Sequence, residues 1–335
     1  MNNQKGLCGI INFGNTCWLN TSIQCLLKSE LLINNNSDKY TNNNTILCNE
    51  WNKLVKGIYE DNCIISPKSF FKTIIKSSND NGYIFNFFNQ NDIHEFLNFF
   101  IDSMHEEIKH KVDITITGKI KNNLDKMAYE AMKQWKSHFK NNYSSIINLF
   151  YGQLVSHIYA VKDNSIHSYN YSPICIFSIP IPENKHNIHF YDCFDLFTKS
   201  QLLDGSNKWK NETDNCYYEA NKNLMIWKFP KILIVHFKRF NNNGSKKKDF
   251  IDIPIDELDM TKYCIGYDKL ESYYTLFGIC NHIGSHISGH YYSYCKNINN
   301  DKWYEFNDTN VSSIKKEDII TKNAYICFFT KIKKL

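Results

Sequence analysis

The hydrophobic pattern of the chain changes near residue 145, and this change constrains the fold more than any other feature. Before it, apolar residues recur at three- and four-residue steps, which is the spacing of amphipathic helices. After about residue 150, short runs rich in aromatic and β-branched side chains predict strands. Helices are expected from Cys17 and over 51–59, 67–75, 92–108 and 124–139, and strands over 152–161, 173–181, 232–237, 273–281, 290–296, 302–306 and 324–331.

The two halves are predicted to form one unit. No linker rich in Pro, Gly or Ser separates them, and no repeat of fixed period occurs. With 335 residues, of which 42% are hydrophobic, the chain can bury a large core. The economical prediction is a single α+β domain in which helices pack against a sheet.

Composition and charge exclude several classes of function. The net charge of +5 is mild, and the basic cluster Lys246 to Lys248 is flanked by turn residues, so no nucleic-acid binding is expected. The N-terminus lacks the blocks of a signal peptide, and no apolar run approaches the length of a membrane span. The twelve cysteines contain no CxxC pair, which favours free thiols in a reducing compartment, the cytoplasm or nucleus.

Cys17 lies where a loop rich in Gly and Asn meets the first predicted helix, with Asn15 and Thr16 as candidate caps. Unpaired N–H groups and the helix dipole stabilise a thiolate there, so a nucleophilic cysteine is the first hypothesis. A small buried apolar cysteine is the alternative. The polar face of this helix is expected opposite its apolar face, and it carries Asn20, Gln24 and Lys28.

His290 begins a strand-like run directly after Gly289, and the run is expected to form a hairpin that turns near Asn299. Position 290 then lies opposite position 307, within about one residue of register. Asn307, with Asp308 beside it, can therefore hold the imidazole in one tautomer, as a third catalytic group must. A structural or surface histidine is the alternative.

Three polar side chains near the two predicted helix starts have both a catalytic and a structural explanation. Asn12 can offer its amide to a developing oxyanion together with the Cys17 N–H, but it can also be a turn residue. Asp92 and Glu95 lead the helix over 92–108, where a cap and a first-turn acid would account for them.

Four boxes occur in a fixed order: GIINFGNTCWLNTSIQCLL, NQNDIHEFL, FPKILIVHFKRF, and SGHYYSYCKN followed by WYEFND. In this order they resemble the ubiquitin-specific proteases, papain-like cysteine peptidases that cleave ubiquitin from proteins. The resemblance implies a single catalytic domain over 6–332. Its α+β, papain-like fold would comprise a helical thumb over about 6–145 and, over about 146–332, β fingers and a palm of mixed or antiparallel strands.

The resemblance also assigns catalytic roles. It implies Cys17 as the nucleophile, His290 as the general base and acid, Asn307 as the group that orients the histidine, and Asn12 as an oxyanion donor. Asp308 resembles a second acid of the family. That acid supports either the third catalytic group, which orients the histidine, or the water network at the oxyanion. The expected activity is thiol-dependent hydrolysis of the peptide or isopeptide bond after the C-terminal glycine of ubiquitin.

Substrate contacts follow from the same resemblance. Asp92 and Glu95 resemble acids that meet arginines in the ubiquitin tail, and a narrow cleft would admit only the two terminal glycines. Tyr291 and Trp303 are candidates to line that cleft, with packing as the alternative for Trp303. The expected partners are ubiquitin and ubiquitinated proteins. We expect the enzyme to be a monomer, and we expect no binding to a membrane.

The chain departs from the family at the zinc ribbon. Many members hold a structural zinc with two CxxC pairs, but the four matching positions here are Ala160, Asp163, Asn211 and Asp214. No tetrahedral thiolate site can form from these residues. We therefore expect no metal and no other cofactor, with fingers held by packing alone.

Three other functions remain compatible with the sequence. The chain could hydrolyse a different ubiquitin-like modifier, or it could bind ubiquitin without cleaving it. It could also be a general papain-like protease for a viral or parasite polyprotein, since the Asn-rich composition is typical of an AT-rich genome. The expected location is inside the cell, and in the cytoplasm of the host if the source is viral.

Overall fold

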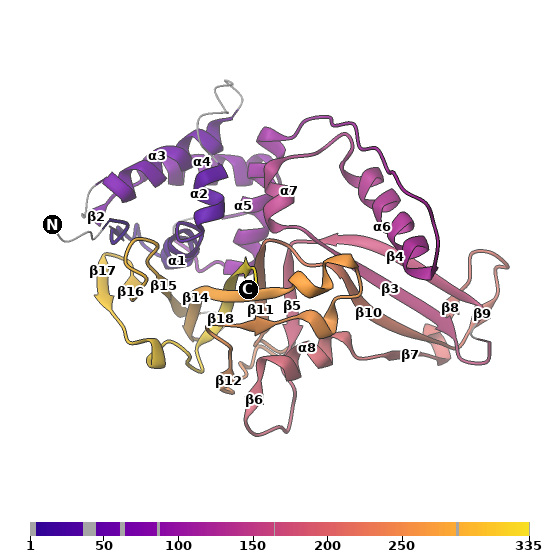
Figure 1. Ribbon diagram of the computed structural model, residues 1–335. Coiled ribbons are helices and arrows are strands. Elements are labelled where there is room, and N and C mark those ends of the chain that lie inside the picture. Colours follow the sequence, from indigo (N-terminus) through magenta and orange to yellow (C-terminus); the bar gives the residue numbers. More distant parts are fainter. Residues whose placement is uncertain are drawn as a thin grey trace.

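A computed structural model describes residues 5–35, 45–60, 64–85, 88–163, 165–285 and 288–334. Helices gather in the first part of the chain and strands in the rest, as the change of pattern predicts (Figure 1). The helices before the first long strand are α1 (Cys17–Leu26), α2 (Glu30–Asn35), α3 (Ile46–Glu60), α4 (Lys68–Asp80), α5 (Ile93–Ile108), α6 (Asn123–Phe139) and α7 (Ser145–Phe150). Helix α8 (Phe190–Thr198) lies within the part rich in strands.

An eight-stranded sheet forms the centre of the molecule. Its strands follow the order β17-β16-β15-β14-β18-β11-β5, with β13 paired to β14. Strands β5 and β11 are parallel and the other pairs are antiparallel. The bounds are β5 (Ile176–Pro180), β11 (Ile232–Lys238), β13 (Leu258–Asp259), β14 (Tyr273–Gly284), β15 (Gly289–Lys296), β16 (Trp303–Asn307), β17 (Asn310–Ser313) and β18 (Ala324–Ile332).

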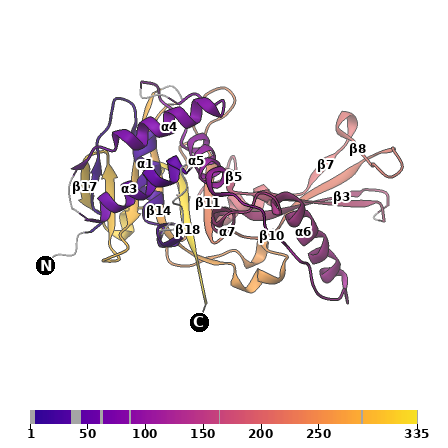
Figure 2. The ribbon, with the colours of Figure 1, turned by 90° about the horizontal axis from the view of Figure 1, so that it is seen from above.

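A second sheet, with the order β4-β3-β10-β7, extends away from α1 to α5, and α6 packs against it (Figure 2). It comprises β3 (Gly152–Ala160), β4 (His167–Ile174), β7 (Gln201–Leu203) and β10 (Ala220–Lys228), and near its far end lies the pair β8 (Trp209–Lys210) and β9 (Tyr217–Tyr218). The single strand predicted over 173–181 is wrong. The chain leaves this sheet after Ile174 and enters the central sheet at Ile176, so one apolar run serves two sheets.

Two short parallel pairs complete the described strands. Strand β1 (Gly9–Ile10) pairs with β2 (Ile64–Ile65), and β6 (Ile188–His189) pairs with β12 (Ile251–Asp252). In the described part of the chain, no helix is both long and apolar enough to cross a membrane. Eleven of the twelve cysteines lie in this part, and all eleven are free thiols.

The central sheet separates two apolar cores because successive side chains of a strand point to opposite faces. On β18, Ile326 and Phe328 join the core between the sheet and the first helices, whereas Cys327 and Phe329 join the core on the other face. The near-continuous apolar run of this strand follows from burial on both faces.

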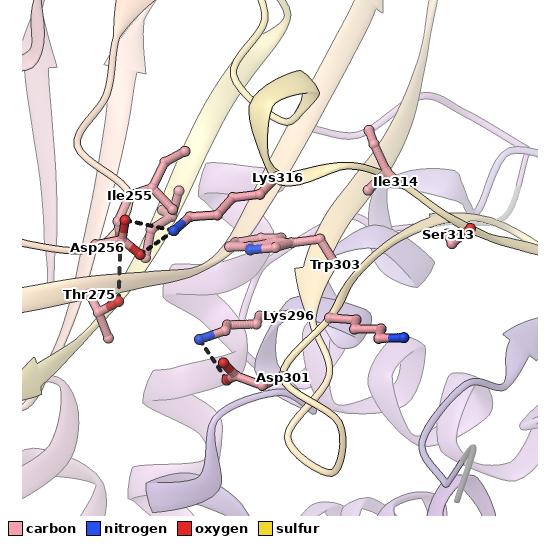
Figure 3. Close-up of a pocket in the computed structure, with 11 residues that line it drawn as sticks. Ile255, Asp256, Thr275, Lys296, Asp301, Trp303, Ser313, Ile314 and Lys316 are labelled. Atoms are coloured by element: carbon pink, nitrogen blue, oxygen red, sulfur yellow. Dashed lines mark hydrogen bonds and ion pairs between the residues drawn. The ribbon is translucent and has the colours of Figure 1, made fainter. Parts of the chain in front are cut away.

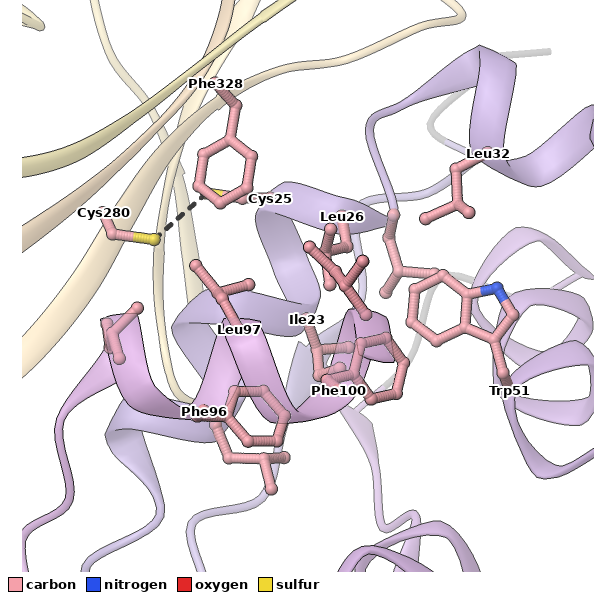
Figure 4. Close-up of a cluster of buried hydrophobic side chains, with 14 of the residues drawn as sticks. Ile23, Cys25, Leu26, Leu32, Trp51, Phe96, Leu97, Phe100, Cys280 and Phe328 are labelled. Carbon is pink, nitrogen blue, oxygen red and sulfur yellow. Dashed lines mark hydrogen bonds between the residues drawn. The ribbon is translucent and has the colours of Figure 1, made fainter. Parts of the chain in front are cut away.

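Helix α1 lies inside the first core, between α5 and strands β14 and β15, and all ten of its residues are buried (Figure 4). The polar face expected opposite the apolar face of this helix is therefore buried as well. The buried polar side chains bond to the N-terminal segment or to the far end of the chain. Asn20 donates to the Asp308 carboxylate, Gln24 to the Cys8 carbonyl oxygen and Lys28 to the Gly6 carbonyl oxygen.

Candidate active site

Cys17 is the first residue of α1 and is 2% exposed. The expected side-chain cap is absent, since Thr16 precedes the helix without capping it. The Thr16 hydroxyl instead accepts from the Phe13 N–H at 3.0 Å, and the Asn15 amide donates to the Phe88 carbonyl oxygen. No side-chain cap therefore satisfies the N–H groups at the start of α1, and the positive end of the helix lies at the thiol.

His290 on β15 contacts both of the groups that the hypothesis assigns to it. Its Nε2 lies 2.7 Å from Asn307 Oδ1, and the ring is also hydrogen-bonded to the Cys17 thiol. The Asn307 oxygen can only accept, so Nε2 carries the proton and Nδ1 is left for Cys17. This is the tautomer that a base acting on the thiol requires.

The surroundings of His290 favour its charged form. The hydrogen bond with Cys17 raises the pKa of His290 to about 9, against the opposing effect of burial, and the bond to Asn307 adds to the rise. The negative charges of Cys17 and Asp308 act in the same direction. The site thus favours the imidazolium form of His290.

The register expected for the β15–β16 hairpin is wrong by two residues. Ser293 pairs with Phe306 and Lys296 with Trp303, so the hairpin is centred between Asn299 and Asn300 and position 290 would align with position 309. A shift of two residues keeps each side chain on its face of the sheet. The His290 and Asn307 side chains therefore still meet, as a diagonal pair beyond the end of the ladder.

Asp308 and Asn307 form hydrogen bonds with different residues. It lies in the tight turn between β16 and β17 with φ +51°, in the left-handed region. Its carboxylate accepts from Asn12 Nδ2 at 2.9 Å and from Asn20 Nδ2 at 2.7 Å. Of the two residues left open by the sequence, Asn307 contacts the histidine ring and Asp308 holds two asparagine amides.

Asn12 is oriented by bonds at both ends of its amide. Its Oδ1 accepts from the Gly14 and Thr16 N–H groups, each at 3.0 Å, which turns the NH₂ group toward Asp308. One amide hydrogen bonds to Asp308, and among the described residues no other acceptor takes the second. These bonds give Asn12 the turn role that was its alternative, and the oxyanion role stays a prediction that the second amide hydrogen would serve.

A cavity of about 340 Å³ lies near Cys17, although Cys17 does not line it. Gln90 forms part of its wall, and the Cys17 Sγ lies 4.0 Å from Gln90 Oε1. Tyr291 also lines this cavity, although its ring is 5% exposed. Other residues of the wall are Asp92, His94, His236 and Tyr325.

The two acids at the start of α5 differ in their surroundings. Asp92 caps the helix, since its Oδ1 accepts from the His94 and Glu95 N–H groups, and its Oδ2 accepts from the Tyr325 hydroxyl at 2.6 Å. Glu95 lies in the first turn and is exposed. The carboxylate of Asp92 thus belongs to the cavity wall, whereas that of Glu95 faces solvent.

Trp303 does not line this cavity. It is 4% exposed and packs in the core on the opposite face of the central sheet. There it borders a separate pocket of about 310 Å³, between the ion pairs Lys316–Asp256 and Lys296–Asp301 (Figure 3). Packing, the alternative considered for Trp303, describes its position.

The four positions that match zinc ligands are held by hydrogen bonds. Ala160 is buried at the end of β3, and Asp163 bonds to Ser165 in the following turn. Asp214 accepts from the Cys216 N–H at 2.9 Å, the Tyr218 hydroxyl at 2.8 Å and the Asn211 amide at 3.1 Å. The expectation of packing alone is wrong here, because a carboxylate organises the β8–β9 hairpin. Over the described ranges, no group of three His, Cys, Asp or Glu side chains could hold a metal ion.

Sequence reasoning missed several polar residues of the site. Lys246, which is flanked by turn residues, donates to the carbonyl oxygen of His282, another residue of the cavity wall. His94 and His236 occur within apolar helical and strand patterns, so nothing in the pattern distinguishes them. The four-box resemblance marked their segments, although it assigned them no role.

Comparisons with known proteins agree with these observations. Residues 8–329 match the family model described as ubiquitin carboxyl-terminal hydrolase. Ubiquitin carboxyl-terminal hydrolase 2 of Homo sapiens is 31% identical over 344 residues, which cover 97% of this chain and 55% of that protein. The Gallus gallus protein of the same name is 30% identical, with 97% and 93% coverage. The chain therefore spans about half the length of the human relative.

Solved structures share the fold. The SAGA Ubp8/Sgf11/Sus1/Sgf73 DUB module bound to ubiquitin aldehyde contains a chain that is 26% identical, with a TM-score of 0.73. The match covers 100% of this chain and 71% of that one. A structure of the module bound to monoubiquitin has the same identity and coverage, with a TM-score of 0.74.

Proposed function

The chain belongs to the ubiquitin carboxyl-terminal hydrolase family, and on that basis we propose that it is a thiol-dependent deubiquitinase acting as a single catalytic domain over 6–332. It has the family's α+β fold, with a helical thumb, a mixed palm sheet and β fingers. The proposed reaction is hydrolysis of the peptide or isopeptide bond after the C-terminal glycine of ubiquitin. The observation that carries it is the contact of His290 with both Cys17 and Asn307.

In the first half of the reaction, the Cys17 thiolate attacks the carbonyl carbon of the terminal glycine. Negative charge moves to the carbonyl oxygen, where the Asn12 amide and the Cys17 N–H donate hydrogen bonds. When the tetrahedral intermediate collapses, the bond to the leaving amine breaks and the His290 imidazolium supplies the proton to that amine. Asn307 keeps the ring in place throughout.

In the second half, water attacks the thioester between Cys17 and ubiquitin. His290, now neutral, accepts a proton from that water, and the bond to sulfur breaks to release the ubiquitin carboxylate and the thiolate. Asp308 acts indirectly in both halves, because it orients the Asn12 amide. No step requires a metal or an organic cofactor.

Substrate contacts are part of the proposal. The cavity beside Cys17 suits the extended tail of ubiquitin, with Asp92 and Tyr291 in its wall and Glu95 exposed at the adjoining helix turn. Exposed carboxylates suit arginine side chains of a basic peptide. The partners would be ubiquitin and ubiquitinated proteins, bound by a monomer, and the free thiols favour the cytoplasm or nucleus as the location.

Reaction with ubiquitin carrying a C-terminal electrophile tests this function. The wild-type protein is expected to form a covalent adduct, and Cys17→Ala is expected to form none. A folded wild-type protein that gives no adduct would contradict the proposal, and an adduct in Cys17→Ala would contradict the choice of nucleophile. A parallel probe made from a ubiquitin-like modifier decides which modifier is preferred, and cleavage of denatured proteins would instead indicate a general protease.

A further inference from the structure

A hollow lined by lysines lies at the opposite end of the central sheet from the cavity near Cys17. The antiparallel strands β11 and β18 extend from one to the other. His236 of β11 lines the cavity, whereas Lys231, just before that strand, lines the hollow, roughly 17 Å away along the backbone. On β18, Tyr325 lines the cavity and Lys331 lines the hollow. This hollow, here called the lysine pocket, is therefore not part of the proposed active site.

The lysine pocket has a volume of about 750 Å³ and an excess of positive charge. Its wall contains two acidic residues, Asp268 and Glu271, against five lysines: Lys228, Lys231, Lys331, Lys333 and Lys334. Lys334 pairs with Glu257 at 2.9 Å, but the other four lysines form no ion pair with any residue that the structure describes. Lysines that lack an internal counter-charge suit an acidic ligand.

A smaller apolar pocket of about 260 Å³ adjoins the lysine pocket, because Lys228 and Asp268 line both. Its apolar side chains come from segments far apart in the chain: Ile114, Ile116, Met132, Trp135, Trp227 and Tyr267. Helix α6 and the end of β18, which border the two pockets, lie toward the same side of the molecule (Figure 2). Tyr267 is 55% exposed and Leu270, in the wall of the lysine pocket, is 79% exposed. Apolar side chains gathered in this way are typical of an interaction surface.

Residues 112–117 border the apolar pocket and have the pattern of a strand without a partner. In their sequence, VDITIT, the apolar residues are half-buried and the polar residues between them are exposed, as in a strand with one covered face. The Val112 N–H donates to the Lys140 carbonyl oxygen at 2.8 Å. Within the described ranges, the main-chain groups of residues 113–117 form no hydrogen bond. Such groups can pair with a strand added from another chain.

We propose that this face binds an extended acidic segment of another protein. The segment pairs as a strand with residues 113–117, places an apolar side chain in the pocket that Trp135 and Trp227 line, and directs its carboxylates toward the lysine pocket. A nucleic acid suits this face less well, because it lacks main-chain groups for strand pairing and its phosphates would meet Asp268 and Glu271. Binding here is independent of the proposed hydrolysis, since the face and the cavity lie at opposite ends of the sheet.

Fluorescence anisotropy with short labelled peptides tests this binding. Each peptide carries several glutamates and one leucine or tryptophan, whose position varies across the set, and control peptides carry lysine for glutamate or serine for the apolar residue. At least one acidic peptide should bind with a micromolar Kd that weakens at high salt, and both kinds of control should bind more weakly. No binding by any acidic peptide would overturn the proposal. Tighter binding of a labelled oligonucleotide would overturn it as well.

Two double variants separate the lysine pocket from a general effect of charge. Lys231→Glu with Lys333→Glu reverses two exposed charges of the pocket and should weaken the best acidic peptide about tenfold or more. Lys72→Glu with Lys76→Glu is the matched control, because it changes the net charge equally at exposed positions of α4, and its affinity should stay within about twofold of wild type. Circular dichroism checks that both proteins are folded. Equal weakening in the two variants would overturn the assignment to this pocket.

Hydrogen exchange and a ubiquitin adduct locate the bound peptide. Amides of residues 113–117 should exchange more slowly when the peptide is bound, and a bound peptide that leaves their exchange unchanged would contradict strand pairing. The protein whose Cys17 carries ubiquitin from an electrophilic probe should bind the peptide as tightly as the free protein does. Loss of peptide binding in that adduct would assign the face to ubiquitin and overturn the proposal. A protein that forms no adduct would contradict the proposed function, while peptide binding to the free protein still decides the present proposal.

Discussion

Among single residues, His290 depends most on its neighbours, because its two ring nitrogens contact two different elements of the fold. Cys17 from α1 and Asn307 from β16 each bond to the ring, and both bonds favour the imidazolium. Asp308, which follows Asn307 directly, turns away to Asn12 and Asn20. Of these two adjacent residues, Asn307 thus bonds to the proposed acid and base, His290, and Asp308 bonds to the proposed oxyanion donor, Asn12.

The pH profile should report this arrangement. The pKa of His290 is raised from the ordinary histidine value of 6.5 to about 9, so the imidazolium is fully present below pH 6.5 and is lost as the pH rises through about 9. We expect kcat/KM for a ubiquitin amide to fall across that upper window, because the proton for the leaving amine is then missing.

Asn307→Ala should lower kcat on the order of 100-fold and move the basic limb to lower pH, because one of the bonds that raises the pKa of His290 is removed. Asp308→Ala is the comparison. It should lower kcat by releasing Asn12, with a smaller movement of the limb. An Asn307→Ala profile with the same limb as wild type would show that the bond does not act on the histidine.

Among the elements, β1 connects the N-terminal segment to the turn that carries Asp308. The Ile10 N–H donates to the Asp308 carbonyl oxygen at 2.8 Å, and a Cβ added to Gly9 would lie 2.3 Å from the Thr309 carbonyl oxygen. Backbone meets backbone here, so no flexible side chain can give way. Glycine at position 9 is required by this close approach.

Gly9→Ala should therefore lower the free energy of unfolding by about 1–3 kcal/mol and reduce kcat/KM, because the turn that orients Asn12 must shift. Gly57→Ala in α3 is the matched control. A Cβ there meets nothing within 4 Å, and alanine in a helix should leave stability unchanged or raise it by up to about 1 kcal/mol. Denaturant unfolding and amide hydrolysis measure both variants, and a Gly9→Ala protein as stable as wild type would contradict the close approach.

In the β8–β9 hairpin, at the end of the fingers, a variant of Asp214 can test whether a carboxylate takes the place of a metal. Bonds from the Cys216 amide and the Tyr218 hydroxyl hold the pKa of Asp214 below its usual range, so the carboxylate stays charged at neutral pH. Asp214→Asn removes the charge and should accelerate hydrogen exchange of the Cys216 amide with little change in melting temperature. A chelator should leave the exchange rate unchanged, and a chelator-induced loss of protection would indicate a metal.

At the scale of the whole molecule, the first core joins the helical part to the sheet. Ile23 of α1 and Phe100 of α5 share this core with Cys280 of β14 and Phe328 of β18 (Figure 4). Helices α1 and α5 therefore bury apolar surface against β14 and β18, which begin only at Tyr273 and Ala324. Such a core unites the two parts into one cooperative unit.

A fragment of residues 1–145 should accordingly fail to fold by itself, while the whole chain should unfold in a single main transition. Circular dichroism and the dispersion of NMR amide signals measure the first expectation, and calorimetry the second. The matched comparison is an equimolar mixture of residues 1–145 and 146–335, in which the missing sheet is restored. A fragment that folds cooperatively without its partner would show that the helical part is an independent domain.

Much of the local structure could be predicted from the sequence. The repeat of 3.6 residues located α5 and α6 to within about one residue of their starts, and the runs of β-branched and aromatic residues located β3, β11 and β18. Local patterns suffice for these elements, because the spacing of apolar residues along the chain indicates whether one face or both faces are apolar. The four boxes also brought Cys17, His290 and Asn307 forward as one group.

The remaining features depended on tertiary contacts. The sequence places Asn20 only on the polar face of its helix, whereas its amide bonds to Asp308, 288 residues away. The hairpin register that sets the His290–Asn307 pair differs by two residues from the prediction. The link from His94 to His236 through Ser178 joins three segments whose patterns give no sign of one another. The sequence alone determined which residues could react and which faces are apolar; the tertiary structure decided which buried polar groups meet, because a buried hydrogen bond needs a specific partner at about 3 Å.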